Sequence, residues 1–432
     1  MNDPTNGGFR SIPHLRVSSV RRGGSLAMLL LLAVPGAWMA ACSSGGSTDA
    51  EDAGTDAPVT KDGAADVTTD TGRTDVDAND AGASEGSADS AVDADADAGE
   101  TFDCTTTTGQ PPSLECSGLY STFATKTVAP ETFEFKPGIE LWSDAAVKRR
   151  WIRFPPGSKV DVTDLNKFVF PVGTQVWKEF KVQVGSSLKR IETRYMVKTG
   201  EFDWFRTTYE WAEDESSTRE LTSGRSNVPG TQNYEIPTQA ACVRCHGGSF
   251  DNLLGFGAVL LGAPSAGLGW NELKQKDLLT STNGVHMTDV ANLQIQGNLT
   301  EKAALGYLHV NCGVSCHNPQ GQGGGRFNAK LDFNAQNRLE PATDVSVVKT
   351  AANKTSGFQP MGVDGGTYYI IRPGDPSRSS MIYRMSRRDT DGGTVEQMPP
   401  IATHRVDDAG VGIVETWIRS LNVDAGYPEA GP

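Results

Sequence analysis

The chain has 432 residues, a formal net charge of −14 and a charged fraction of 21%. That length is sufficient for two or three domains once non-globular segments are removed. The negative charge is concentrated in residues 43–103, where 17 Asp and Glu stand against Lys61 and Arg73, a net of −15. The overall acidity therefore says nothing about the partners of the folded part, and no pattern in the remainder predicts a nucleic-acid partner.

Residues 1–41 have the pattern of a secretory signal peptide. Several arginines precede a short apolar run, Leu26–Val34, and small residues follow it up to Cys42. The run is too short to serve as a membrane span. Met39-Ala-Ala-Cys42 resembles a bacterial lipobox, which implies that Cys42 becomes a lipidated N-terminus; the alternative is an ordinary cleavage site beside a small residue. We expect export to the periplasmic side, with a lipid anchor in the inner or outer membrane.

Residues 42–103 combine this lipidated cysteine with a predicted disordered linker. The segment consists of Asp, Ala, Gly, Thr and Ser with almost no large apolar side chains. Such a composition cannot bury enough surface to offset the conformational entropy of the chain. We therefore interpret it as a tether between the lipid and the fold.

The seven cysteines divide into groups without remainder. Cys42 is assigned to lipid, and Cys104 and Cys116 flank a short polar loop, for which a disulfide is the simplest interpretation. The other four form two pairs, each followed by a histidine. An unpaired thiol is a liability in an oxidising compartment. Because this assignment gives every one of the seven cysteines a role, it is consistent with an exported protein.

Residues 104–237 are predicted to form an antiparallel β-rich domain. Apolar and polar side chains alternate in residues 174–182 and 190–198, and turn signals such as Pro137-Gly138 separate several such runs. A period of two with frequent turns is typical of an antiparallel sheet or sandwich. No catalytic motif is present in this region.

After Pro237 the pattern changes to short helices and Gly-rich connections. Residues 301–310 predict a helix that leads into Cys312. Asp407 and Asp408 can cap a final helix, whose apolar face comprises Val411, Val414, Trp417, Ile418 and Leu421.

The run Cys242-Val-Arg-Cys245-His246 has the spacing of a c-type haem attachment motif. Two residues between the thiols let both sulfurs reach the vinyl groups on one porphyrin edge, and the adjacent histidine becomes the proximal iron ligand. A zinc knuckle would require a fourth ligand, and a thioredoxin-like dithiol would require a parallel βαβ context. The sixth ligand is open among Met287, His286 and Met196.

Cys312-Gly-Val-Ser-Cys316-His317 has the same arrangement with one extra residue, and Gly313 offers the longer loop freedom. The alternative is a disulfide with an incidental histidine. Met398, which precedes Pro399-Pro400, is the candidate sixth ligand of this second iron, since a thioether from a Pro-rich loop commonly lies opposite a proximal histidine.

At these residues the chain resembles the exported dihaem c-type cytochromes of Gram-negative bacteria that have a β-rich N-terminal segment. The resemblance covers most of residues 130–421. It rests on the two cysteine–histidine runs and on Leu141-Trp-Ser-Asp-Ala-Ala146, Phe170-Pro-Val-Gly-Thr174, Ile191-Glu-Thr-Arg194, Tyr209-Glu-Trp211, Gly306-Tyr-Leu-His-Val-Asn-Cys312, Arg372-Pro-Gly-Asp-Pro376 and Met398-Pro-Pro400. The family implies haem-binding roles for Cys242, Cys245, His246, Cys312, Cys316 and His317. The chain departs from it in having three residues between the second pair of cysteines, where members usually have two.

Together these patterns predict a β-rich domain at 104–237, a first haem-binding unit at 238–299 and a second, cytochrome c-like domain at 300–425, the last two mainly α-helical. The expected function is covalent haem binding with electron transfer, using two haem c groups with His246, His317 and Met398 as iron ligands, and passing electrons to an unidentified redox partner protein. A dihaem oxidoreductase such as a peroxidase, with the first haem as the reactive site, is the alternative. A structural lipoprotein with vestigial haem sites is the third interpretation.

Overall fold

The computed structural model describes residues 103–106, 110–263, 266–323, 325–360, 365–388, 396–422 and 426–427. The predicted signal peptide, the predicted lipidation site Cys42 and nearly all of the acidic segment lie outside the described residues. Within the described part, no helix is both long enough and apolar enough to cross a membrane.

A six-stranded antiparallel sheet with the order β3-β4-β6-β7-β8-β9 dominates the fold. Its strands are β3 (Phe133–Glu134), β4 (Val147–Arg153), β6 (Gln175–Val184), β7 (Ser187–Lys198), β8 (Trp204–Trp211) and β9 (Thr218–Glu220). The short β1 (Tyr120–Thr122) pairs with β2 (Thr127–Val128), and β5 (Val160–Asp161) pairs in parallel with β10 (Leu279–Thr280).

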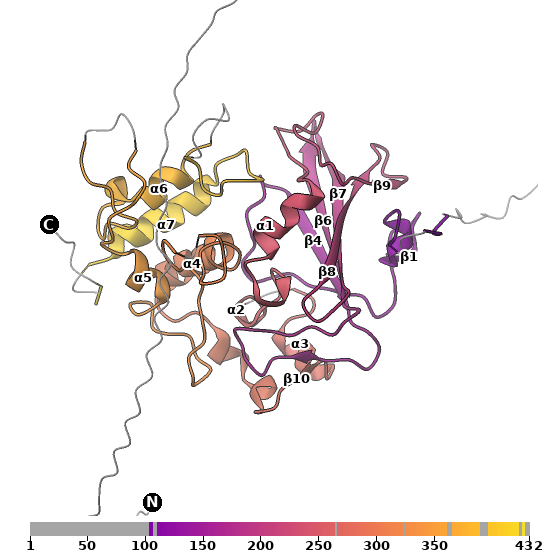
Figure 1. Ribbon diagram of the computed structural model, residues 1–432, viewed down its shortest axis with the longest axis horizontal. Coiled ribbons are helices and arrows are strands. Elements are labelled where there is room, and N and C mark those ends of the chain that lie inside the picture. The colour runs from indigo at the N-terminus through magenta and orange to yellow at the C-terminus, as the bar shows by residue number, and fades with distance from the viewer. Residues whose placement is uncertain are drawn as a thin grey trace, which may run out of the picture. The chain divides into compact units, whose positions relative to one another are not determined.

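Both faces of this sheet are covered, because its strands carry large apolar side chains in alternation. One face bears an aromatic cluster that includes Trp151, Trp177 and Tyr209, and the N-terminal segment packs on it. The opposite face contributes Ile152, Val176 and Met196 to a second core shared with the helices. Figure 1 shows the helices on one side of the sheet and β1 on the other. The sheet is thus the central layer of the described fold.

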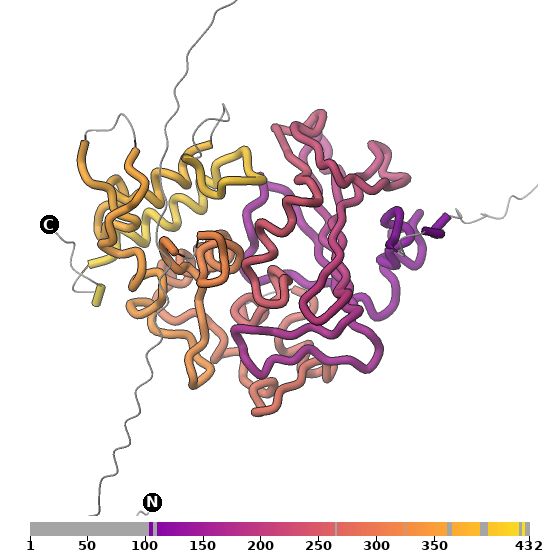
Figure 2. Tube along the Cα trace, viewed as in Figure 1, coloured from indigo at the N-terminus to yellow at the C-terminus, as the bar shows by residue number. Residues whose placement is uncertain are grey.

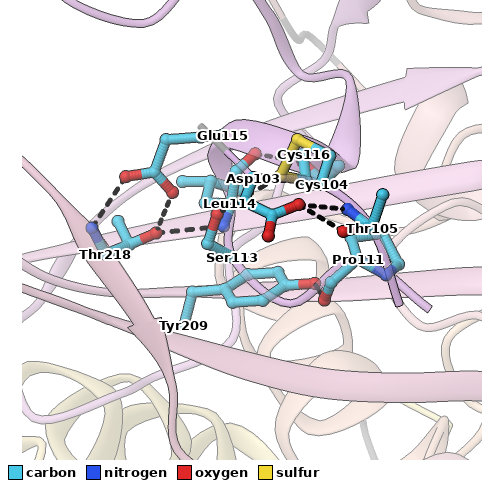
Figure 3. Close-up of a disulfide and its surroundings, with 11 residues drawn as sticks. Asp103, Cys104, Thr105, Pro111, Ser113, Leu114, Glu115, Cys116, Tyr209 and Thr218 are labelled. Atoms are coloured by element: carbon cyan, nitrogen blue, oxygen red, sulfur yellow. Dashed lines mark hydrogen bonds between the residues drawn. A yellow bond between two sulfur atoms is a disulfide. The ribbon is translucent and has the colours of Figure 1, made fainter. Parts of the chain in front are cut away.

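The disulfide expected between Cys104 and Cys116 is present, with the two Cα atoms 5.3 Å apart. Hydrogen bonds tie this segment to the sheet (Figure 3): the Tyr209 hydroxyl donates to the Pro111 carbonyl at 2.8 Å, and Thr218 N donates to Glu115 Oε1 at 2.8 Å. The disulfide therefore closes a loop that is anchored on β8 and β9.

The helices are few and mostly short. They are α1 (Cys242–His246), α2 (Ala258–Gly262), α3 (Trp270–Gln275), α4 (Leu299–Leu308), α5 (Ser346–Ala351), α6 (Ser380–Met385) and α7 (Asp408–Ser420). The longest, α7, begins after the Asp407 cap, whose Oδ1 accepts from Gly410 N at 3.0 Å. It packs against α4 closely enough that a Cβ on Gly410 would meet the Tyr307 ring at 2.3 Å.

The prediction of mainly α-helical cytochrome c-like domains is wrong. Helices cover about a quarter of residues 103–432, and the region is a β-rich antiparallel fold. The physical reason is that Gly- and Pro-rich connections interrupt the chain after residue 237, so most helices end after one or two turns. Helices this short gain their stability from packing on the sheet and on one another rather than from their own hydrogen bonds.

Candidate functional site

The first cysteine–histidine run forms α1, which is anchored to the sheet at its start. Thr238 Oγ1 accepts from Ala241 N at 3.2 Å, and Gln239 Nε2 donates to the Arg206 carbonyl on β8 at 2.7 Å. Cys242, Cys245 and His246 are all half-buried. The three side chains therefore remain partly accessible beside the sheet.

His246 is oriented by the backbone that follows α1. Its Nδ1 lies 2.8 Å from the carbonyl oxygen of Asn252. Because a carbonyl can only accept, Nδ1 carries the proton and Nε2 keeps its lone pair. Burial lowers the pKa of His246 to about 4, so the ring is neutral at pH 7. The structure thus presents a neutral imidazole with one nitrogen available as an acceptor or ligand.

The second run begins where α4 passes into a π-helical turn, His309–Gly313. Such wide turns recur at functional sites. His317 N donates to the Cys312 carbonyl at 2.7 Å, which closes the longer spacer over Cys312. Gly313 is required here for space rather than for backbone freedom, since a Cβ would lie 2.6 Å from the Ala329 carbonyl. The extra residue between the cysteines is accommodated by this turn.

His317 is buried and stacks on Phe327, with ring centroids 4.1 Å apart. Burial lowers the pKa of His317 to about 4. Among the described residues, none accepts from or donates to its Nδ1 by hydrogen bonding. A buried, neutral imidazole with an unpartnered nitrogen costs free energy unless it serves a binding role.

A cavity of about 340 Å³ lies beside this turn, and its lining includes Cys312, Cys316, His317 and Met398. Met398 reaches it because its backbone N donates to the Arg384 carbonyl on α6 at 2.9 Å. Most of the remaining lining is apolar or aromatic, including Tyr307, Phe327, Phe358, Ile370, Met381 and Met385. The volume lies in the range of small-molecule sites in proteins.

The two cysteine-bearing turns are packed directly against each other, as the adjacent traces of α1 and the segment after α4 in Figure 2 suggest. The buried Asn318 donates through Nδ2 to the Gly248 carbonyl at 3.0 Å and to the Gly313 carbonyl at 2.7 Å. A Cβ on Gly248 would lie 1.7 Å from the Ser315 carbonyl oxygen. Burial raises the pKa of the Cys245 thiol, and Cys316 adds to that effect.

The thiols of these turns are not tuned for nucleophilic catalysis. Burial raises the pKa of Cys242, and it raises that of Cys312 to about 12. Catalytic cysteines instead have lowered pKa values, because the thiolate is the reactive form. The surroundings of both turns therefore favour neutral thiols.

The prediction of two haem c groups requires correction. Within the part of the chain that the structure describes, no group of three or more His, Cys, Asp or Glu side chains is placed so that it could hold a metal ion. This finding contradicts the cofactor prediction, which is therefore wrong for the structure described. The cysteine–histidine runs determine only how far apart these side chains lie along the chain. Tertiary packing decides whether they are placed so that they could bind a metal ion.

The candidate sixth ligands of the first site are used elsewhere or exposed. Met196 is buried in the core beneath the sheet. Met287 is 63% exposed. His286 forms a hydrogen bond through Nδ1 with Ser281 Oγ at 2.8 Å. The structure gives no reason to assign any of the three to α1.

The site also includes residues that the sequence did not single out. Asn318 and Gly248 connect the two turns through a hydrogen bond. Asp251 attaches the segment that follows α1 to the sheet through a buried ion pair with Lys198. The alternation of β6 and β7 could have placed Lys198 on an inward face. The partners of Gly248 and Asn318 could not be found, because they depend on contacts 70 residues apart.

No family model matches the chain, and neither the curated proteins nor the solved structures contain a match to it.

Proposed function

We propose that this chain is an exported electron-transfer protein whose redox centre lies in the cavity beside the second cysteine-bearing turn. The main observation behind this proposal is that one cavity is lined by two thiols, an imidazole and a thioether. They belong to Cys312, Cys316, His317 and Met398. Paired thiols can be oxidised reversibly to a disulfide, which releases two electrons and two protons. The four side chains come from two segments about 80 residues apart, so the fold rather than local sequence assembles them.

The surroundings of the cavity support electron transfer over group-transfer catalysis. Its walls are largely apolar and aromatic, and such a shell controls solvent access and tunes a reduction potential. The neutral imidazole of His317 lacks the near-neutral pKa expected of a general acid or base. These properties fit a site that holds a redox state rather than one that shuttles protons.

Met398 and Met287 provide a matched test. Met398 lines the cavity, whereas Met287 is an exposed methionine on a short turn of the same chain. In potentiometric titration of the purified protein, Met398→Ala should shift the midpoint potential by about 30 mV or more, or about 1.4 kcal/mol for a two-electron couple. Met287→Ala should leave the potential unchanged. A wild-type protein without a redox transition, or equal shifts in both variants, would refute the proposal.

The proposal includes a membrane tether. Lipid on Cys42 would anchor the protein on the periplasmic side, where a second redox protein can reach it, and the acidic segment after Cys42 would be repelled by anionic lipid. Cys42→Ser should therefore release the protein from the membrane fraction with its redox titration intact. Retention of the variant in that fraction would mean that something other than lipid on Cys42 holds it there.

A further inference from the structure

A row of positively charged side chains crosses the sheet on the face that α1 covers. In the strand register, Arg150 on β4 lies directly opposite Lys178 on β6, and Lys178 lies directly opposite Arg194 on β7. Arg206 on β8 stands opposite Met196, two residues from Arg194 along β7, so it shares the same face. Four cations from four adjacent strands therefore lie side by side.

This row adjoins the first cysteine-bearing turn. The Arg206 carbonyl accepts from Gln239, three residues before Cys242. The positive charges of Arg194 and Arg206 both act on the Cys242 thiol and oppose the rise of its pKa that burial causes. Figure 1 shows α1 lying against the strands that carry these cations. The row therefore lies beside the turn.

The negative charges around the row do not balance the positive ones. Glu140 pairs with Arg150 at 3.0 Å, and Glu192 pairs with Arg194 at 2.7 Å. The other carboxylates on this face are engaged elsewhere, since Glu210 pairs with Arg219 and Arg225, and Asp251 pairs with Lys198. Among the described residues, Lys178 and Arg206 have no carboxylate partner. Lys148 adds a further positive charge, and its only hydrogen bond to a described residue is to the Leu141 carbonyl.

Such an arrangement is costly if nothing binds to it. Like charges directly opposite on neighbouring strands destabilise a sheet. Burial and the positive charges of Arg150, Lys148 and Arg194 hold the pKa of Lys178 well below its usual value. Lys178 has only a ring contact, with Nζ 4.8 Å from the Phe180 centroid. Arg206 Nε is buried with no hydrogen-bond partner among the described residues. Lys178 and Arg206 are nevertheless only half-buried, so solvent reaches both residues.

We propose that this row binds an anion with two or more negatively charged oxygens, carboxylate or phosphate, between Lys178, Arg194 and Arg206 and beside Cys242 and Cys245. The guanidinium groups offer forked donors that match such oxygens, and the ammonium adds a point charge. The bound anion would satisfy Arg206 and relieve the repulsion within the row. The inference is independent of the electron-transfer proposal, because it concerns a different turn and a different ligand.

Lys178 and Lys181 provide a matched pair of variants on one strand. Lys181 lies on the opposite face of β6, where its Nζ is 3.8 Å from Glu179. The full-length exported protein is titrated calorimetrically with pyrophosphate and, separately, with succinate at low ionic strength. Binding of one or both anions is expected, with a dissociation constant at least about tenfold weaker in Lys178→Gln and unchanged in Lys181→Gln. Pyrophosphate binding alone would identify a phosphate ligand, and succinate binding alone a carboxylate.

Thermal unfolding gives an independent readout. Without an anion, Lys178→Gln should melt at or above the temperature of the unmodified protein, because it removes a repelled charge. With pyrophosphate or succinate, the unmodified protein should gain more in melting temperature than the variant. Arg206→Gln serves as a second variant if Lys178→Gln does not fold. The proposal is overturned if neither anion binds the unmodified protein, or if Lys181→Gln weakens binding as much as Lys178→Gln.

Discussion

Lys198 and Asp251 form an ion pair that is almost completely withdrawn from solvent, with Nζ 2.6 Å from Oδ2 and side chains only 1% and 0% exposed. The Asp251 carboxylate also accepts two hydrogen bonds. Its Oδ2 accepts from Phe170 N at 2.7 Å, and its Oδ1 accepts from Trp204 Nε1 at 3.1 Å. The next residue, Asn252, offers its carbonyl to His246. This pair therefore fixes on the sheet the segment that orients the histidine of α1.

Removal of one partner of this pair should destabilise the fold strongly. Asp251→Ala leaves a buried, uncompensated ammonium, and such changes cost about 3–5 kcal/mol. The Lys159–Asp277 pair is the control, because its N–O distance is also 2.6 Å but its side chains are 38% and 80% exposed. Asp277→Ala should cost less than about 1 kcal/mol. Urea unfolding of both variants measures the difference, and equal losses would show that the buried pair has no special role.

The disulfide should contribute to stability through loop closure. Cys104 and Cys116 are 12 residues apart, and a loop of roughly this length is expected to contribute about 3 kcal/mol. The double variant Cys104→Ser, Cys116→Ser should lower the free energy of unfolding by about that amount, as should reduction of the intact protein. An unchanged urea midpoint would mean that the hydrogen bonds to Tyr209 and Thr218 alone hold the segment.

Gly248 should be indispensable for the contact between the two cysteine-bearing turns. In Gly248→Ala the new Cβ would meet the Ser315 carbonyl at 1.7 Å, so one turn must move and the hydrogen bond from Asn318 must lengthen or break. We expect a loss of about 2 kcal/mol or more, as for other overpacked sites. Gly257 is the control, because a Cβ there would meet nothing within 4 Å. Gly257→Ala should be within about 0.5 kcal/mol of the unmodified protein in the same urea experiment.

His309 should make the fold sensitive to acid. It is 4% exposed, its Nδ1 accepts from Leu331 N at 3.0 Å, and burial lowers its pKa to about 3. Because the folded pKa lies below the unfolded value of about 6.5, the unfolded state binds the proton more tightly. The stability that His309 contributes is therefore complete above pH 6.5 and is lost as the pH falls towards 3, by at most about 1.4 kcal/mol per pH unit.

Replacement of His309 by Gln separates this effect from general acid denaturation. Gln retains an oxygen that can accept from Leu331 but does not titrate. Urea unfolding at intervals between pH 7 and pH 4 should show a shallower pH dependence in His309→Gln than in the unmodified protein. Identical slopes would mean that other groups, such as His246, His317 and the carboxylates, account for the whole effect.

Local patterns in the sequence predicted the structure correctly where it depends on a single helix or strand. The alternation in residues 174–198 corresponds to β6 and β7, and Asp407 caps α7 as its position ahead of an apolar face suggested. The helical prediction after residue 237 failed because the spacing of apolar residues does not show where Gly-rich connections stop a helix. The turn that holds Cys312 is wide because of a π-helical register, which no local pattern indicates.

The candidate site was predictable only in part. The cysteine–histidine runs identified Cys312, Cys316 and His317, and the Pro-rich loop identified Met398, all of which line one cavity. The cofactor prediction failed because lining one cavity is not sufficient: among the described residues, no three His, Cys, Asp or Glu side chains are placed so that they could hold a metal ion. The cationic row on β4, β6, β7 and β8 was not noticed in the sequence, since its members become neighbours only through strand pairing.

The most direct test of electron transfer is a coulometric titration of the purified protein. Electrons are added stepwise to the oxidised protein and then withdrawn, while the turnover of hydrogen peroxide is followed in parallel. We predict reversible uptake of two electrons per chain in addition to those that reduce the Cys104–Cys116 disulfide, with peroxide turnover well below about 1 s⁻¹, the low end of ordinary enzyme rates. Absence of this additional uptake, or peroxide turnover at or above that rate, would contradict electron transfer.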